Sequence, residues 1–120
     1  MMQYKFSIYI WGNTKVYNVE TQEGDYKVLE NFTWHGWMSA EAQRVIDGVK
    51  ATQSGVEQKF RFQVGEDIAG TSLDDGVYLF DLLASRATGI KTMRPALILT
   101  HAEFLDFMQN LKAFLESQGV

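Results

Sequence analysis

The sequence predicts an α+β domain, in which a largely antiparallel sheet of five or six strands carries two helices on one face, in the order βββ-α-βββ-α. Three observations favour this class. Several short segments alternate apolar and polar side chains with a period of two, as half-buried strands do. Two segments place their apolar residues on one side of a helix. Turn residues separate the strand-like segments at spacings typical of hairpins, which join antiparallel strands.

The chain is expected to form a single domain, residues 1–120. Of its 120 residues, 46% are apolar and 13% are aromatic. This length suffices for one hydrophobic core, and the composition is unlike that of disordered chains. No internal repeat, low-complexity tract or linker marks a boundary within the sequence.

The first third of the sequence predicts three strands. Residues 3–10 alternate imperfectly, Gly12-Asn13 is a turn signal, and residues 15–20 alternate again, so a β-hairpin is expected. Gly24-Asp25 marks the next turn, and residues 26–34 are interpreted as a third strand.

A helix is expected to follow, with Ser39 as its N-cap and Gly55 as its end. Gly48 weakens this helix by about 1 kcal/mol relative to alanine. The apolar stripe has the spacing i, i+3, i+4, i+7 and consists of Ala42, Val45, Ile46 and Val49.

The second half of the sequence predicts three more strands. Residues 59–64 alternate cleanly, residues 77–83 form an apolar run, and residues 96–99 form a short central-looking strand after the single proline. Residues 65–75 are interpreted as a loop, and residues 85–94 as a polar connection.

The last helix has the clearest signature. Thr100 and Glu103 have the spacing of a capping box, in which each side chain accepts from the other residue's backbone N–H, and Gly119 provides a stop. A wide apolar face follows, made by Phe104, Phe107, Met108, Leu111, Phe114 and Leu115.

Composition excludes several classes of function. Fifteen acids against eleven bases give a net charge of −4, which disfavours nucleic-acid binding. The absence of cysteine excludes disulfide scaffolds, thiol nucleophiles and thiolate metal sites. The first ten residues lack the features of a signal peptide, and no apolar window is long enough to cross a bilayer, so a cytoplasmic protein without membrane contact is expected.

Charge is segregated along the middle of the chain. Residues 62–85 contain five acids and no base, and residues 82–102 contain three bases and no acid. A patch of one sign steers a partner of the other sign. We therefore expect four acids to gather in one flexible loop and to bind lysines or arginines of a partner, namely Glu66, Asp67, Asp74 and Asp75. The alternative interpretation is ordinary turn chemistry.

Two tryptophans offer an apolar anchor for the same partner. In a strand, Trp34 and Trp37 would point to opposite sides, so one of them would be exposed, and exposed tryptophans are typical hot spots of interfaces. The alternative is that both cover the edge of the core beside the first helix.

Other polar residues are candidate sites. Asp81 lies within an apolar run, where Arg86 or Arg94 is expected to pair with it. Arg94 and Arg86, with Lys91, also define a possible anion site, or simply a solvated connection. Neither His35 nor His101 has the neighbours of a regular metal site, and the sequence contains no phosphate loop or catalytic motif, so no metal or cofactor is expected.

An acidic, cysteine-free α+β chain without a catalytic constellation resembles bacterial immunity proteins, which neutralise a cognate secreted toxin. The resemblance lies in the overall character of the whole chain and assigns no residue. It implies a stoichiometric complex with a basic toxin domain in the cytoplasm, whereas a secretion chaperone or another small inhibitor would look similar. The alternative function is a small enzyme or ligand-binding domain, with an apolar pocket between sheet and helices lined by Trp34, Tyr78 and Phe104 and with Asp81 or His35 as its polar group.

Overall fold

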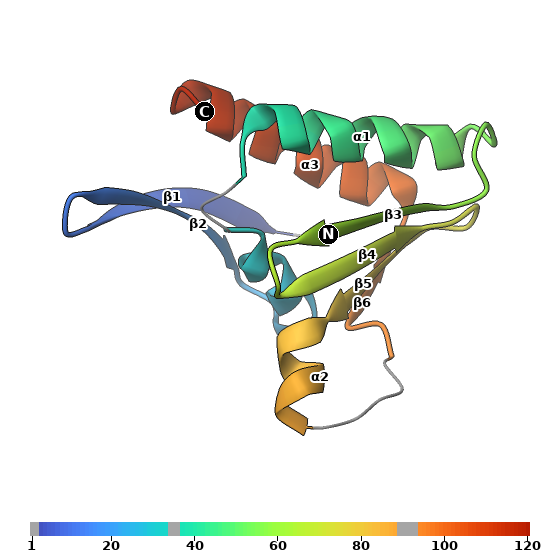
Figure 1. Cartoon of the computed structure of the whole chain (residues 1–120), viewed down its shortest axis with the longest axis horizontal. Helices are drawn as coiled ribbons and strands as arrows, with labels where there is room; N and C mark the ends of the chain where they lie inside the picture. The colour runs from blue at the N-terminus through green and yellow to red at the C-terminus, as the bar shows by residue number, and fades with distance from the viewer. Residues whose placement is uncertain (1–2, 34–36, 89–93) are drawn as a thin grey trace.

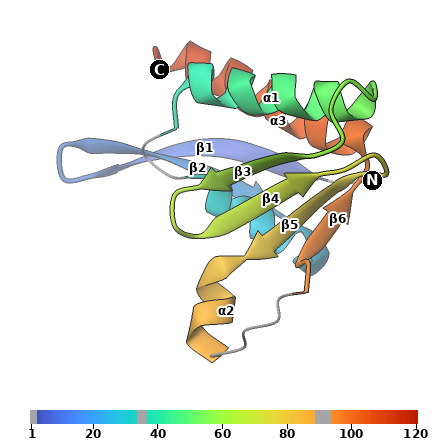
Figure 2. The ribbon, with the colours of Figure 1, turned by 45° about the vertical axis from the view of Figure 1, so that its right-hand side comes forward.

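The computed structural model describes residues 3–33, 37–88 and 94–120 of the chain. Two long helices, α1 and α3, lie side by side against one face of a four-stranded sheet, and a hairpin, β1–β2, projects away from them (Figures 1 and 2). In chain order the elements are β1 (Tyr4–Trp11), β2 (Thr14–Thr21), the 3-10 helix η1 (Gly24–Thr33), α1 (Ser39–Gln53), β3 (Phe60–Val64), β4 (Ile68–Ser72), β5 (Val77–Asp81), α2 (Leu82–Thr88), β6 (Leu97–Leu99) and α3 (His101–Ser117).

The predicted α+β class and antiparallel pairing are confirmed, whereas the single sheet and the order βββ-α-βββ-α are wrong. The strands form two separate sheets, β1–β2 and β3–β4–β5–β6, and every pair within them is antiparallel. The hairpin forms a sheet of its own because it packs on α3 and does not pair with a strand of the larger sheet.

The N-terminal hairpin is confirmed. Its register runs from Tyr4 opposite Thr21 to Trp11 opposite Thr14, which leaves a two-residue turn. Gly12, the first central residue of that turn, has φ 64°, and Asn13 has a negative φ. This is the conformation of a type II′ turn, whose twist matches that of the strands it joins.

The predicted third strand is wrong, because residues 24–33 form η1. Its fully or nearly buried side chains are Val28, Leu29 and Phe32, whose spacing of i, i+1 and i+4 places them on one side of a helix. A strand would bury residues at intervals of two, and Leu29 does not fit that pattern. The core therefore selects the helical form of this segment.

Helix α1 buries the predicted stripe together with Thr52. The predicted N-cap is wrong by one residue, because Met38 is the N-cap and Ser39 instead donates its backbone N–H and its hydroxyl to the carbonyl of Val120. Gly48 allows the ring of Phe60 to lie directly against the helix, since a Cβ at this position would overlap the ring. Gly48 therefore lowers the stability of the helix but allows close packing of α1 on β3.

The four-stranded sheet contains one strand that was predicted as a loop. Strand β4, Ile68–Ser72, occupies the middle of the expected loop 65–75 and pairs with both β3 and β5. Its inward residues are Ile68, Gly70 and Ser72, all buried. Gly70 makes room for the ring of Phe62, and small residues of this kind give a weak strand signal in a sequence.

The predicted strand over residues 77–83 ends at Asp81. The Asp81 carboxylate accepts from the backbone N–H of Ala84 at 2.9 Å and so caps α2, in a region that was predicted to be a polar connection. The capping box of α3 is confirmed: Thr100 Oγ1 accepts from the N–H of Glu103 at 3.1 Å, and Glu103 Oε1 accepts from the N–H of Thr100 at 3.0 Å.

Candidate interaction surfaces

Strand β4 separates the four predicted acids into two pairs. Glu66 and Asp67 lie in the turn before it, and Asp74 and Asp75 lie just after it. Five strand residues span about 17 Å, so the pairs sit at opposite ends of the sheet and do not gather in one loop.

The turn that carries Asp74 and Asp75 is held firmly. Leu73 donates its N–H to the carbonyl of Gly76 at 2.9 Å, and its own carbonyl accepts from His101 Nε2 at 2.6 Å. The phenol of Tyr78 donates to the Asp75 carboxylate at 2.8 Å, and this hydrogen bond raises the pKa of Tyr78 above 10.0, with smaller contributions from burial and from the charges of both aspartates. The ion pairs among the described residues join other side chains, so none of these pairs neutralises Asp74 or Asp75.

The other pair is partly compensated by the chain itself. Arg86 of α2 donates to the backbone carbonyl of Glu66 at 2.6 Å, which brings a cation beside this turn. The carbonyl of Asp67 accepts from the N–H of Leu82 at 2.8 Å. The expected pairing of Asp81 with an arginine is wrong among the described residues, since Asp81 caps α2. The Asp74 and Asp75 turn is therefore the stronger anionic end.

Between the two ends lies an open face of the sheet, opposite the face against which α1 and α3 pack (Figure 2). Strand alternation directs half of the residues of β3 to β6 to this side, which we call the outer sheet face. It is half-buried or exposed throughout, and Ile98 is 57% exposed. The register aligns two rows of side chains, Arg61, Thr71, Tyr78 and Ile98 in one and Gln63, Ala69 and Phe80 in the other.

The predicted tryptophan anchor is not supported for Trp37. Its side chain is 5% exposed and stacks on Phe32 in the core, with ring centroids 6.2 Å apart. A residue buried in this way cannot anchor a partner. Trp34, His35 and Lys91 lie outside the described residues.

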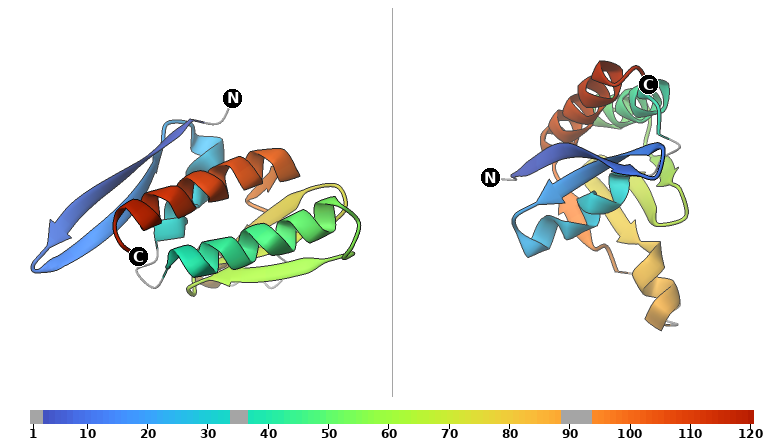
Figure 3. Two further views of the ribbon diagram at one scale, coloured as in Figure 1. Left: turned by 90° about the horizontal axis from the view of Figure 1, so that it is seen from above. Right: turned by 90° about the vertical axis from the view of Figure 1, so that its left-hand side faces the viewer.

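Among the described residues, the hairpin carries a run of four consecutive exposed large apolar side chains. Residues 8–17, which we call the arm, begin where Tyr17 packs on Phe114 and extend past the end of α3 (Figure 3). Exposure rises from 40% at Ile8 through 49% at Tyr9 and 70% at Ile10 to 76% at Trp11. The sequence contains a signal for these exposed apolar side chains. Ser7 is the only polar residue between Phe6 and Trp11, so neither face of this part of the strand is polar and both cannot be buried in one core.

The apolar pocket of the alternative function is not found among the described residues. Phe104 is fully buried under the inner face of the sheet, whereas Tyr78 lies on the outer face, so the two cannot share a cavity. The space among the hairpin aromatics, Trp37 and α3 is about 10 Å³, too small for a ligand.

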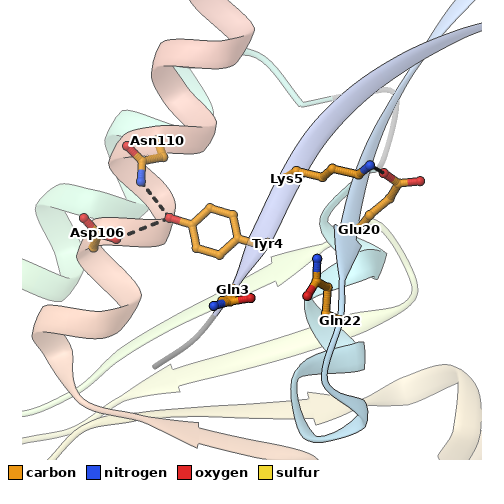
Figure 4. A pocket seen from close by; sticks show the side chains of 7 residues that line it. All are labelled: Gln3, Tyr4, Lys5, Glu20, Gln22, Asp106 and Asn110. Atoms are coloured by element: carbon orange, nitrogen blue, oxygen red, sulfur yellow. Dashed lines mark hydrogen bonds and ion pairs between the residues drawn. The ribbon is translucent and has the colours of Figure 1, made fainter.

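A polar hollow of about 450 Å³ lies where the hairpin meets α3 (Figure 4). The phenol of Tyr4 donates to Asp106 at 3.3 Å and accepts from the Asn110 amide at 2.6 Å. Burial raises the pKa of Tyr4, and the Asp106 charge adds to this rise while the bond from Asn110 opposes it. These bonds satisfy the tyrosine internally and fix the hairpin to α3.

Metal chemistry has no candidate in the parts of the chain that the structure describes, where no three histidine or acidic side chains converge. His101 is 9% exposed and serves the β4–β5 turn. None of the described helices has the length and apolar character needed to span a bilayer. No family model, curated protein or solved structure matches the chain.

Proposed function

We propose that the protein is a stoichiometric protein-binding module of the immunity or antitoxin type, which neutralises a basic partner domain in the cytoplasm. The observation that carries this proposal is the outer sheet face, an open and partly apolar surface with a pair of carboxylates at each end. The partner that fits it presents an apolar ridge flanked by lysine or arginine side chains.

The two parts of this surface have different roles. Tyr78, Phe80 and Ile98 supply apolar contact at the centre, where burial stabilises a complex. Asp74 and Asp75 attract cations over a longer range and accelerate the encounter. Arg86 lowers the corresponding effect of Glu66 and Asp67, so the steering is concentrated at the β4–β5 turn.

An enzymatic function has less support. Asp81 caps a helix and His101 binds a backbone carbonyl, so neither of these side chains faces a nucleophile across a cavity. The described residues thus offer surfaces suited to a macromolecule rather than an enclosed reaction site.

The test uses the full chain as bait in an extract of its native host, with mass spectrometry of the retained proteins. The variant Asp74→Lys with Asp75→Lys reverses the stronger end, and Glu23→Lys with Glu57→Lys is the matched control, because both of those acids are exposed and lie off the outer sheet face. We expect a basic protein to be retained by the wild type and the control and lost by the reversed variant.

Association kinetics then test whether the two carboxylates act by electrostatic steering. At low salt, the association rate of the captured partner should fall at least about tenfold for the reversed variant, and the difference should shrink as salt rises. An association rate that is unchanged at low salt contradicts the role of Asp74 and Asp75. Equal loss in the control would indicate a net-charge effect without a defined surface.

A further inference from the structure

The arm presents a strand edge that is open along its whole length. Among the described residues β1 pairs with β2 alone, and β1 is the outer strand of the hairpin (Figure 3, left), although Tyr4 and Phe6 at its base pack on α3. Natural proteins usually protect such an edge with proline, bulges or charged side chains. The stretch from Phe6 to Trp11 contains none of these. An unprotected apolar edge of this kind is built to receive another strand.

The backbone of β1 alternates in the direction of its hydrogen-bonding groups. In a hairpin with a two-residue turn, the residues that flank the turn bond to each other, here Trp11 and Thr14. Counting back from Trp11, every second residue bonds to β2, so Phe6, Ile8 and Ile10 direct their N–H and C=O groups to the open edge. These are the groups that an added strand would use.

We propose that the occupant of this edge is a second copy of the chain, joined by antiparallel β1–β1′ pairing about a two-fold axis at Ile8. Ile8 then lies opposite its own symmetry mate, and Ile10 lies opposite Phe6 of the other copy. Trp11 lies opposite Lys5, where an indole and an ammonium attract each other. The two hairpins form one four-stranded sheet in the order β2–β1–β1′–β2′.

Charge favours this self-pairing. All fifteen acids of the chain lie from Glu20 onward, so residues 1–19 carry lysines only. The proposed register places Lys15 of one copy on the face of the paired sheet that carries α3 of the other copy, where Asp106 supplies a carboxylate. The two acidic bodies meanwhile lie at opposite ends of the paired arms, which keeps their mutual repulsion small.

The available area is also sufficient. The side chains from Ile8 to Trp11 expose on the order of 500 Å² per copy, so a symmetric pair can bury at most about 1,000 Å² of this area, which is the size of the smallest specific interfaces. The arm is apolar on both faces, so a partner resting on one face alone would leave half of it in water. Strand addition at the edge places neighbours on both faces at once.

The oligomeric state of the full chain tests the proposal by sedimentation velocity from about 1 to about 200 µM. The wild type should form a dimer, and Ile8→Lys should raise the dimer dissociation constant at least about tenfold. Val56→Lys is the matched control, because Val56 is 76% exposed and lies away from the arm, and it should leave the dimer intact. Far-UV circular dichroism checks that each variant remains folded.

A cross-link gives the second measurement. Because the chain has no cysteine, Ile8→Cys introduces a single thiol on the proposed two-fold axis. Mild oxidation should convert this variant to a covalent dimer at concentrations where Val56→Cys remains monomeric, since opposed residues of paired strands lie within disulfide reach.

The outcomes separate the possible occupants. A wild type that stays monomeric over the whole range, or a dimer that Ile8→Lys leaves unchanged, overturns the proposal. Binding of a monomeric wild type to vesicles of anionic phospholipid, abolished by Ile10→Lys, would assign the arm to a lipid surface instead. Neither result bears on the outer sheet face, so this proposal and the proposed function can fail separately.

Discussion

A hydrogen bond connects the anionic turn to the outer sheet face. Tyr78 belongs to the row of β5 side chains on that face, and its phenol donates to Asp75 in the turn. A neutral phenol suits this position because it can donate, whereas a phenolate would be repelled by the neighbouring carboxylates. The bond orients one aspartate toward the face that we propose for the partner.

We predict that Asp75→Asn lowers the pKa of Tyr78 toward its ordinary value. The pKa of Tyr78 is raised above 10.0 in the folded protein, mainly by this hydrogen bond. The stabilisation it reflects is therefore fully present below pH 10 and is lost as the pH rises through the raised value. Absorbance of tyrosinate during an alkaline titration measures the shift, with Tyr78→Phe identifying the signal.

Asp106→Asn is the matched control for this titration, because it removes an aspartate beside Tyr4 and leaves Tyr78 untouched. It should lower the pKa of Tyr4 alone. If the Tyr78 titration is the same with aspartate or asparagine at position 75, the bond does not persist in solution.

Single residues were the least predictable level of the structure. The spacing of Trp34 and Trp37 predicted that one of them is an exposed anchor, but Trp37 fills the core, and of the tryptophans that the structure describes Trp11 in the hairpin is exposed. Which apolar side chain becomes exposed depends on where neighbouring elements end. Here α3 covers Phe6 but does not reach Ile10, and that boundary is not written in the local pattern.

Elements with strong periodicity were predictable. The capping box and apolar face of α3, the stripe of α1 and the alternation of β3 follow from the sequence and appear as expected. The segments that were wrong have weak or mixed patterns. β4 pairs small residues with one buried isoleucine, and η1 resembles a strand until its buried residues are placed around a helix.

The contact between α1 and β3 yields an element-scale prediction. Overlap of the new methyl group with the Phe60 ring should cost about 1–3 kcal/mol, whereas helix propensity gains about 1 kcal/mol, so Gly48→Ala should lower the free energy of unfolding by up to about 2 kcal/mol. Urea denaturation measures the change.

The same substitution in a Phe60→Ala variant tests whether the Phe60 ring causes the loss of stability. In Phe60→Ala the ring is gone, so adding Gly48→Ala should now stabilise the helix by about 1 kcal/mol. If Gly48→Ala has the same effect with phenylalanine or alanine at position 60, close packing is not what the glycine provides.

At the scale of the whole molecule, the two proposed surfaces lie far apart. The arm occupies one end of the 42 Å long axis, and the β4–β5 turn with Asp74 and Asp75 occupies the other (Figure 1). The sequence indicated the charge segregation but not that Asp74 and Asp75 lie at the far end of the sheet from Glu66 and Asp67, because β4 was predicted as a loop. Once β4 is a strand, its two ends must point in opposite directions.

We therefore predict that the two surfaces act independently. Ile8→Lys should abolish dimerisation and leave the association rate with a captured basic partner unchanged, while Asp74→Lys with Asp75→Lys should slow that association and leave the dimer intact.

Salt distinguishes the two surfaces in the wild type. Raising the salt concentration from about 0.01 M to about 1 M shortens the screening length from about 30 Å to about 3 Å, which weakens steering by carboxylates and spares apolar strand pairing. Sedimentation velocity and association kinetics across this range measure both responses. Parallel loss of dimer and partner binding with salt, or in either variant, would mean that one surface serves both contacts.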